Sequence, residues 1–77
     1  MQKVIAEIRK NKLHKYIVST KEFRGHKFID VRLYFEDSDG IWRPSKKGIT
    51  IKPEIAQSLI GAIVGGLCHI DPDPERI

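Results

Sequence analysis

The sequence has a single cysteine, Cys68, so no disulfide can form within the chain. Its three histidines stand far apart, and none has a second Cys or His at the spacing of a metal site. A chain of 77 residues buries only about 60% of the surface that its unfolded form exposes. Small domains therefore usually add a disulfide, a metal or a partner subunit. With the first two excluded, the sequence predicts one domain that is stabilised by oligomerisation.

Long hydrophobic runs are also missing. The longest, around Ile55 to Leu67, is too short to span a bilayer, and Met1 leads directly into charged residues rather than into a signal peptide. One unpaired cysteine fits a reducing compartment. We therefore expect a soluble protein without membrane contact that is not secreted. It would be cytoplasmic or nucleoid-associated in a prokaryote and nuclear in a eukaryote.

The sequence lacks the constellations that are typical of enzymes. No nucleophile–base pair is indicated, and no phosphate-cradling glycine loop leads into a helix. The acidic loop of Glu36, Asp37 and Asp39 does not have the spacing of a calcium-binding EF-hand. The sequence thus predicts no catalytic residues, no bound metal and no cofactor. Asp30 lies among apolar neighbours, and we expect it to make an ion pair or a hydrogen bond to the backbone.

Negative charge is scarce in the first two-thirds of the chain. Residues 1–52 carry 13 Lys and Arg against 6 Asp and Glu, whereas residues 53–77 carry one Arg against 4 acidic residues. The six aromatic residues all lie in the basic part: Tyr16, Phe23, Phe28, Tyr34, Phe35 and Trp42. Holding a single strand of nucleic acid requires cations that neutralise phosphates and rings that stack on bases. The composition predicts that function for residues 1–52.

Periodicity predicts strands throughout this basic part, from period-2 alternation and from β-branched and aromatic residues. The strands are expected at residues 3–9, 16–20, 27–35 and 41–51, with turns at 11–12, 24–26 and 36–40. Pro44 cannot donate to a sheet ladder, so it predicts an edge position or a bulge for the fourth strand. In the third strand Phe35 shares parity with Val31 and Leu33, which favours a core position unless a bulge turns its ring outward.

After Pro53 the period becomes helical. The apolar positions cover about 200° of the helical wheel, whereas a helix lying on one sheet needs a stripe of only about 100°. The excess predicts a second buried contact, most simply the same helix of another copy. This dimer interface would consist of Ile55, Leu59, Ile60, Ile63, Val64 and Leu67. Gly65 and Gly66 are expected to weaken or end the helix. Residues 1–68 would form the domain, and residues 69–77 an acidic, mobile tail.

Three segments carry a family resemblance: Phe23-Arg24-Gly25; Ile29-Asp30-Val31-Arg32-Leu33-Tyr34-Phe35; and, beyond Gly40 and Pro44, Lys46-Lys47-Gly48-Ile49-Thr50-Ile51 with Pro53-Glu54. In order and spacing they resemble the positive-cofactor-four family of transcriptional coactivators, over about Val18 to Leu59. The resemblance implies an α+β fold in which a curved four-stranded antiparallel sheet is followed by one helix (β-β-β-β-α). It also implies a dimer through the helices, with grooves that hold two antiparallel single strands or the strands of a melted duplex.

The resemblance also implies nucleic-acid contacts, carried over by motif position to Phe23, Arg24, Arg32, Phe35, Arg43, Lys46 and Lys47. Charge and neighbourhood add Trp42, Lys15, Tyr16 and Lys21 as further candidates. The family often has Trp where this chain has Phe35, and Trp42 stands where the family is usually not aromatic. The sequence therefore leaves open whether Phe35 or Trp42 is the main stacking ring.

The function implied by the resemblance is sequence-tolerant binding of single-stranded DNA by a homodimer, in transcription, replication or repair, without catalysis. The alternative is a protein-interaction module whose sheet or tail docks on a transcription or replication partner, with nucleic acid secondary. RNA is a third candidate ligand, because nothing in the sequence distinguishes a strand that carries 2′-hydroxyls.

Overall fold

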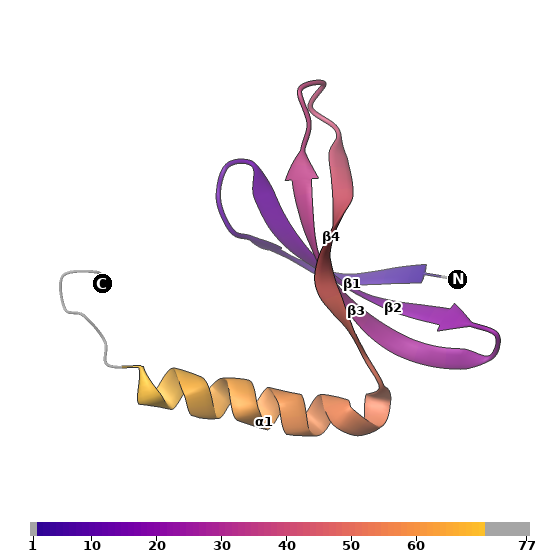
Figure 1. Ribbon diagram of the computed structural model, residues 1–77, viewed down its shortest axis with the longest axis vertical. Helices are drawn as coiled ribbons and strands as arrows, with labels where there is room; N and C mark the ends of the chain where they lie inside the picture. Colours follow the sequence, from indigo (N-terminus) through magenta and orange to yellow (C-terminus); the bar gives the residue numbers. More distant parts are fainter. Residues whose placement is uncertain (1, 71–77) are drawn as a thin grey trace.

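The computed structural model describes residues 2–70, which form four strands followed by one helix (Figure 1). The elements are β1 (Gln2–Arg9), β2 (His14–Phe23), β3 (His26–Glu36), β4 (Trp42–Ile51) and α1 (Pro53–His69). The strands form one antiparallel sheet in the order β1-β2-β3-β4. This confirms the predicted α+β fold. From residue 71 onward, the predicted acidic tail lies outside the described residues.

Tight turns set the register of the sheet and extend two strands beyond their predicted ends. Between β2 and β3, Arg24 and Gly25 have φ angles of 53° and 79°, as in the two-residue type I′ turn that matches strand twist. Pairing therefore continues to Phe23 and His26. Gly40, with φ of 77°, adopts in the β3–β4 loop a left-handed conformation that side chains disfavour.

Strand β4 lies at one edge of the sheet and is irregular next to Pro44. Tyr34 of β3 pairs with Pro44, but Arg32 pairs with Gly48, so the residues between Pro44 and Gly48 stand opposite Leu33 alone. Both positions expected for a strand proline, an edge and a bulge, are confirmed here.

Successive residues of a strand point to opposite sides, and directly paired residues of neighbouring strands share a side. One side of the sheet, called the charged face, carries Arg9 of β1, Lys15, Ile17, Ser19 and Lys21 of β2, Phe28, Asp30, Arg32 and Tyr34 of β3, and Trp42, Gly48 and Thr50 of β4. The other, called the apolar face, carries Ile8, Tyr16, Val18, Val31, Leu33, Phe35, Arg43, Ile49 and Ile51. The predicted alternation along β3 is confirmed.

The chain buries few apolar side chains. Among the described residues the buried hydrophobic side chains are Ile17, Leu33 and Ile51. So small a set indicates that one copy of the chain does not complete a hydrophobic core.

Helix α1 begins at Pro53, where a residue without an N–H fits the first helical position, and extends below the sheet in Figure 1, apart from the strands. The strand it meets most is β3, and within residues 2–70 no residue of α1 is buried. Gly65 and Gly66 do not end the helix, because it continues to His69; the alternative expectation, that they weaken it, stays a prediction. Neither glycine takes the positive φ of a helix-terminating residue; among the described glycines only Gly25 and Gly40 do.

Candidate nucleic-acid interface

The centre of the charged face is an ion-pair network around Asp30, whose side chain is buried. Arg32 binds it in a bidentate manner, with Nη2 donating to Oδ1 at 2.8 Å and Nε donating to Oδ2 at 3.2 Å. Lys21 Nζ lies 3.5 Å from Oδ2. The hydrogen bonds from Arg32 lower the pKa of the Asp30 carboxyl, and Asp30 raises the pKa of Arg32. The ion pair expected at Asp30 is confirmed.

Arg32 also donates hydrogen bonds to the backbone of the bulge in β4. Its Nη1 donates to the carbonyl oxygens of Ser45 at 3.4 Å and Lys46 at 3.2 Å. Gly48 leaves room for this arrangement, because a Cβ there would lie 2.5 Å from the Val31 carbonyl oxygen and 2.9 Å from Arg32 Cζ. Most N–H groups of Arg32 are thus engaged by the protein. Its predicted contact with nucleic acid stays a prediction.

The bulge itself presents two neighbouring cations at the sheet edge. The Ser45 hydroxyl donates to the Leu33 carbonyl at 2.7 Å and accepts the backbone N–H of Lys47 at 3.1 Å. Lys46 and Lys47 are exposed. A hydrogen-bonded bulge therefore holds the backbone from which both lysines extend, as suits a contact with two successive phosphates.

At one end of the charged face, Trp42 lies under cations from two other strands. Lys15 Nζ is 4.4 Å and Arg9 Cζ is 5.2 Å from the ring centroid. Lys15 Nζ also lies 2.6 Å from Glu7 Oε1. Sequence reasoning missed Arg9, because a hairpin centred on the predicted turn at 11–12 would place it opposite His14, whereas the register places it directly opposite Lys15.

The second candidate ring, Phe35, lies on the apolar face and is 36% exposed. Its cross-strand partner Arg43 donates from Nε to the Asp37 carboxylate. This hydrogen bond is the main cause of the lowered pKa of Asp37. Tyr16 shares the face, is 37% exposed, and has Lys10 Nζ at 6.0 Å from its ring centroid. Phe35 and Trp42 are thus on opposite faces.

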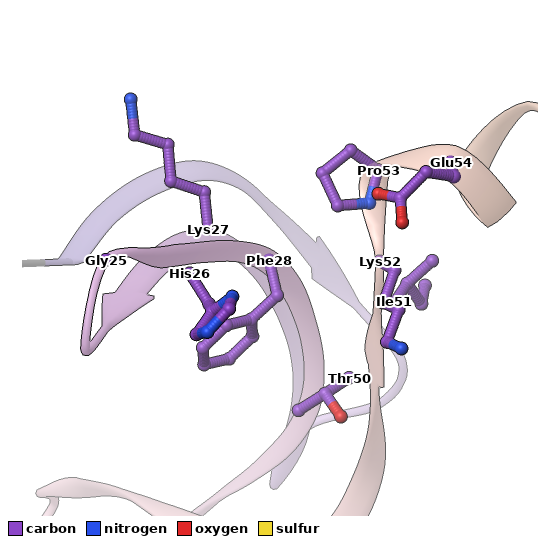
Figure 2. Close-up of a pocket in the computed structure, with 9 residues that line it drawn as sticks. All are labelled: Gly25, His26, Lys27, Phe28, Thr50, Ile51, Lys52, Pro53 and Glu54. Atoms are coloured by element: carbon purple, nitrogen blue, oxygen red, sulfur yellow. The ribbon is translucent and has the colours of Figure 1, made fainter.

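The β2–β3 turn presents the remaining predicted pair. Phe23 is 62% exposed, and Arg24 Cζ lies 5.0 Å from its ring centroid. Beside it, a groove of about 670 Å³ runs between the start of β3 and the β4–α1 junction. In Figure 2, His26 and Phe28 lie on one side of this groove, and Thr50 and Ile51 lie on the other. Lys27 and Lys52 also line it, but the Lys27 side chain points away from the groove in Figure 2, so the groove combines an aromatic wall with the cation of Lys52.

The eleven predicted residues therefore fall into four groups: Phe23 and Arg24 at the turn; Lys15, Lys21, Arg32 and Trp42 on the charged face; Tyr16, Phe35 and Arg43 on the apolar face; and Lys46 and Lys47 on the bulge. Within residues 2–70, no group of three His, Cys, Asp or Glu side chains lies close enough to hold a metal ion. No helix in that range is long and apolar enough to cross a membrane.

Comparison with known proteins gives a match to the family model of the transcriptional coactivator p15 (PC4) over residues 10–62. A PC4 homolog from Burkholderia pseudomallei has a similar structure in an orthorhombic crystal form: identity 31%, TM-score 0.83, coverage 88% of this chain and 92% of that chain. Its tetragonal form gives 32% identity, a TM-score of 0.80 and coverages of 86% and 97%.

A third structure is that of a bacteriophage T5 homolog of the eukaryotic coactivator PC4, a protein implicated in recombination-dependent DNA replication. It is 22% identical, has a TM-score of 0.69, and the alignment covers 87% of this chain and 77% of that chain. At this identity the likeness concerns the fold. The family match begins at the β1–β2 turn and ends within α1.

Proposed function

The chain belongs to the PC4 family of transcriptional coactivators, which implicates it in a DNA-binding, coactivator-like role, and we propose that it binds single-stranded DNA as a homodimer, without catalysis. One observation carries the proposal. The family match over residues 10–62 contains every candidate contact, from Lys15 to Lys47, and these residues form clusters of rings and cations on the sheet.

Exposed rings favour a single strand over a duplex. Phe23, Tyr16 and Phe35 are each at least one-third exposed, and a ring can stack only on a base that is free of its neighbours. Helix α1 supports the same choice, because residues 53–69 include no Lys or Arg. A helix that reads the major groove of a duplex needs such residues for phosphates and base edges.

The proposed homodimer follows from the surface of α1. Ile55, Ile60, Ile63, Val64 and Leu67 are each more than half exposed, and most helical stability in proteins comes from tertiary packing of an apolar face. A second copy of α1 offers the same apolar surface and forms a self-complementary two-fold interface. Such a dimer would join two sheets, so that two strands, or two stretches of one strand, could be held at once.

The proposal is tested by titrating a labelled oligo-dT of roughly twenty nucleotides, long enough for more than one sheet, beside a duplex and an RNA of matched length. We expect the tightest binding for single-stranded DNA, and an affinity that falls with salt at a log–log slope of about −0.7 per phosphate contact. Absence of binding at low salt, or equal affinity for duplex, would contradict the proposal. Binding of RNA alone would replace DNA by RNA as the ligand.

Substitution of the bulge lysines locates the contact. Lys46→Ala with Lys47→Ala should lower the salt slope by about 1.4 and the affinity at 0.1 M salt about 25-fold, if each lysine makes one phosphate contact. The matched control is Lys3→Ala with Lys12→Ala, which removes the same charge from exposed residues outside the candidate set. Equal losses in the two variants would show that the bulge is not a specific contact.

A further inference from the structure

Trp42 is the only tryptophan of the chain, and it has more cations near its ring than any other described aromatic side chain. Arg9 comes from β1 and Lys15 from β2, and both lie within 6 Å of the ring centroid. The two cations are directly paired across β1 and β2. Three strands that are not all neighbours thus converge on one indole.

The two cations are held in place by the protein. Arg9 Nη1 donates to the carbonyl oxygens of Asn11 at 3.5 Å and Lys12 at 3.0 Å, in the β1–β2 turn. Lys15 Nζ lies 2.6 Å from Glu7 Oε1. Glu7 is half-exposed, so its attraction for Lys15 is screened by solvent, and an incoming phosphate could take its place. The two cations are therefore held in position before a ligand binds, and Lys15 can still exchange Glu7 for a phosphate.

The cluster is separate from the other candidate ring. Trp42 pairs with Glu36, and the next residue, Arg43, pairs with Phe35, so the two rings project from opposite faces of the sheet. A single stack of bases cannot include both. Arg9 also precedes the residues that match the family model, so the cluster is not contained in the family match.

We propose that Arg9, Lys15 and Trp42 form a nucleotide subsite, here called the Trp42 subsite. A base stacks on the indole, the two cations neutralise the phosphates on either side of it, and Lys15 exchanges Glu7 for a phosphate. The inference rests on the proposed function, because it extends the path of the same single strand around the end of the sheet. Phe35 and Trp42 then serve separate contacts.

The direct test needs no substitution, because Trp42 is the only source of tryptophan fluorescence. The full chain is titrated with fluorescein-labelled oligo-dT of increasing length, following tryptophan emission and label anisotropy together. We expect quenching of emission with the same midpoint as the anisotropy for long oligonucleotides, and loss of the quenching for those too short to reach the subsite. Binding of the long oligonucleotides by anisotropy with unchanged tryptophan emission would overturn the subsite and leave the proposed function intact. Absence of binding would instead overturn the proposed function.

Two variants separate stacking from packing. Trp42→Leu keeps an apolar side chain but no ring, and should weaken binding roughly 5- to 150-fold, whereas Trp42→Phe should recover much of the affinity. Arg9→Met keeps the aliphatic stem and should weaken binding about 5-fold at 0.1 M salt, with Lys12→Met in the same turn as the matched control. Wild-type affinity in a folded Trp42→Leu chain would contradict the subsite. If that variant does not fold, the wild-type quenching decides.

Discussion

The four strands are tied together by tight turns, ladders and the Asp30–Arg32–Lys21 network, whereas α1 contacts the sheet chiefly at β3 and buries none of its own residues. The buried polar groups of the sheet find their hydrogen-bond partners within the chain. Among the described residues, no buried side-chain nitrogen or oxygen lacks such a partner. In the helix, the large apolar side chains are left in solvent. The buried polar groups of the sheet therefore need no partner from outside the chain, whereas the apolar side chains of α1 need one to be buried.

The difference assigns a separate task to each region. The sheet carries the cations and all the rings on a backbone that its own hydrogen bonds hold, which suits a preformed binding surface. The helix has neither, and its exposed apolar surface suits assembly. The predictions below test this division, from the largest expected effect to the smallest.

The largest effect is expected in the helix. Ile63 lies near the centre of the apolar stripe and is 63% exposed. Ile63→Glu should raise the dissociation constant of the dimer at least about 100-fold, because a buried unpaired carboxylate costs several kcal/mol. Sedimentation equilibrium measures this change directly. DNA affinity should fall with it, because the two sheets would no longer act together.

Ser58→Glu is the matched control for that variant. Ser58 lies on the polar side of the helical wheel, roughly 140° from Ile63 at 100° per residue, and is exposed. It should leave the dimer intact. Equal dissociation of both variants, or an unchanged dimer with Glu at position 63, would show that the apolar stripe is not the interface.

The second effect concerns the centre of the sheet. Asp30→Asn leaves Arg32 without its carboxylate and should lower the free energy of unfolding by about 3 kcal/mol. Since Arg32 lowers the pKa of Asp30 in the folded chain, the folded state binds fewer protons than the unfolded state as the pH approaches 4. The stabilisation by the ion pair is therefore complete above the unfolded-state pKa and is lost as the pH falls through the lowered folded-state pKa.

Urea unfolding at neutral pH and near pH 3 measures both parts of this prediction. The wild type should lose stability on acidification, and Asp30→Asn should lose less. The same loss in both chains would show that other carboxyl groups cause the acid dependence.

The third prediction compares a glycine of the sheet with one of the helix. Gly48→Ala should lower the unfolding free energy by about 2 kcal/mol, because the new Cβ would meet the Val31 carbonyl oxygen at 2.5 Å. Gly65→Ala meets nothing within 4 Å and should raise it by up to about 1 kcal/mol through helix propensity. Urea unfolding of both variants measures the sign of each change in unfolding free energy. Destabilisation by Gly65→Ala would show that a partner packs closely against this side of α1.

The smallest effect concerns the turn. Arg24 has a left-handed backbone conformation, which costs a residue with a side chain about 1 kcal/mol and which Asn tolerates better. Arg24→Asn should thus raise stability by up to about 1 kcal/mol while weakening binding of oligo-dT about 5-fold, through loss of one phosphate contact. Thermal unfolding and anisotropy measure the two changes. An unchanged or higher affinity for oligo-dT would show that Arg24 does not contact a phosphate.

The order of elements, the strand alternation and the bulge at Pro44 could be predicted because they depend on local patterns: a period of two, a period of 3.6 and a residue without an N–H. The end of the helix could not. Gly65 and Gly66 are compatible with either a helical or a left-handed backbone, and the sequence does not show that the helix continues to a cap at Ile70.

Sequence reasoning names candidate residues for the site but does not predict how they are arranged. Charge and rings pointed to Arg32, yet only the register shows that Asp30 and the carbonyls of β4 already occupy most of its donors. In the same way, Phe35 and Trp42 are seven residues apart in sequence. Their positions on opposite faces follow from the pairing of β3 with β4 after the loop, which composition does not determine.

The division between sheet and helix is tested most directly by an NMR titration of the full chain with oligo-dT, following every backbone amide. The largest shifts should fall in the β2–β3 turn, around Phe35, and from Trp42 to Gly48, while amides of α1 beyond its first turn stay unchanged. Largest shifts along residues 57–69, with the sheet unchanged, would contradict the assignment of binding to the sheet and assembly to the helix.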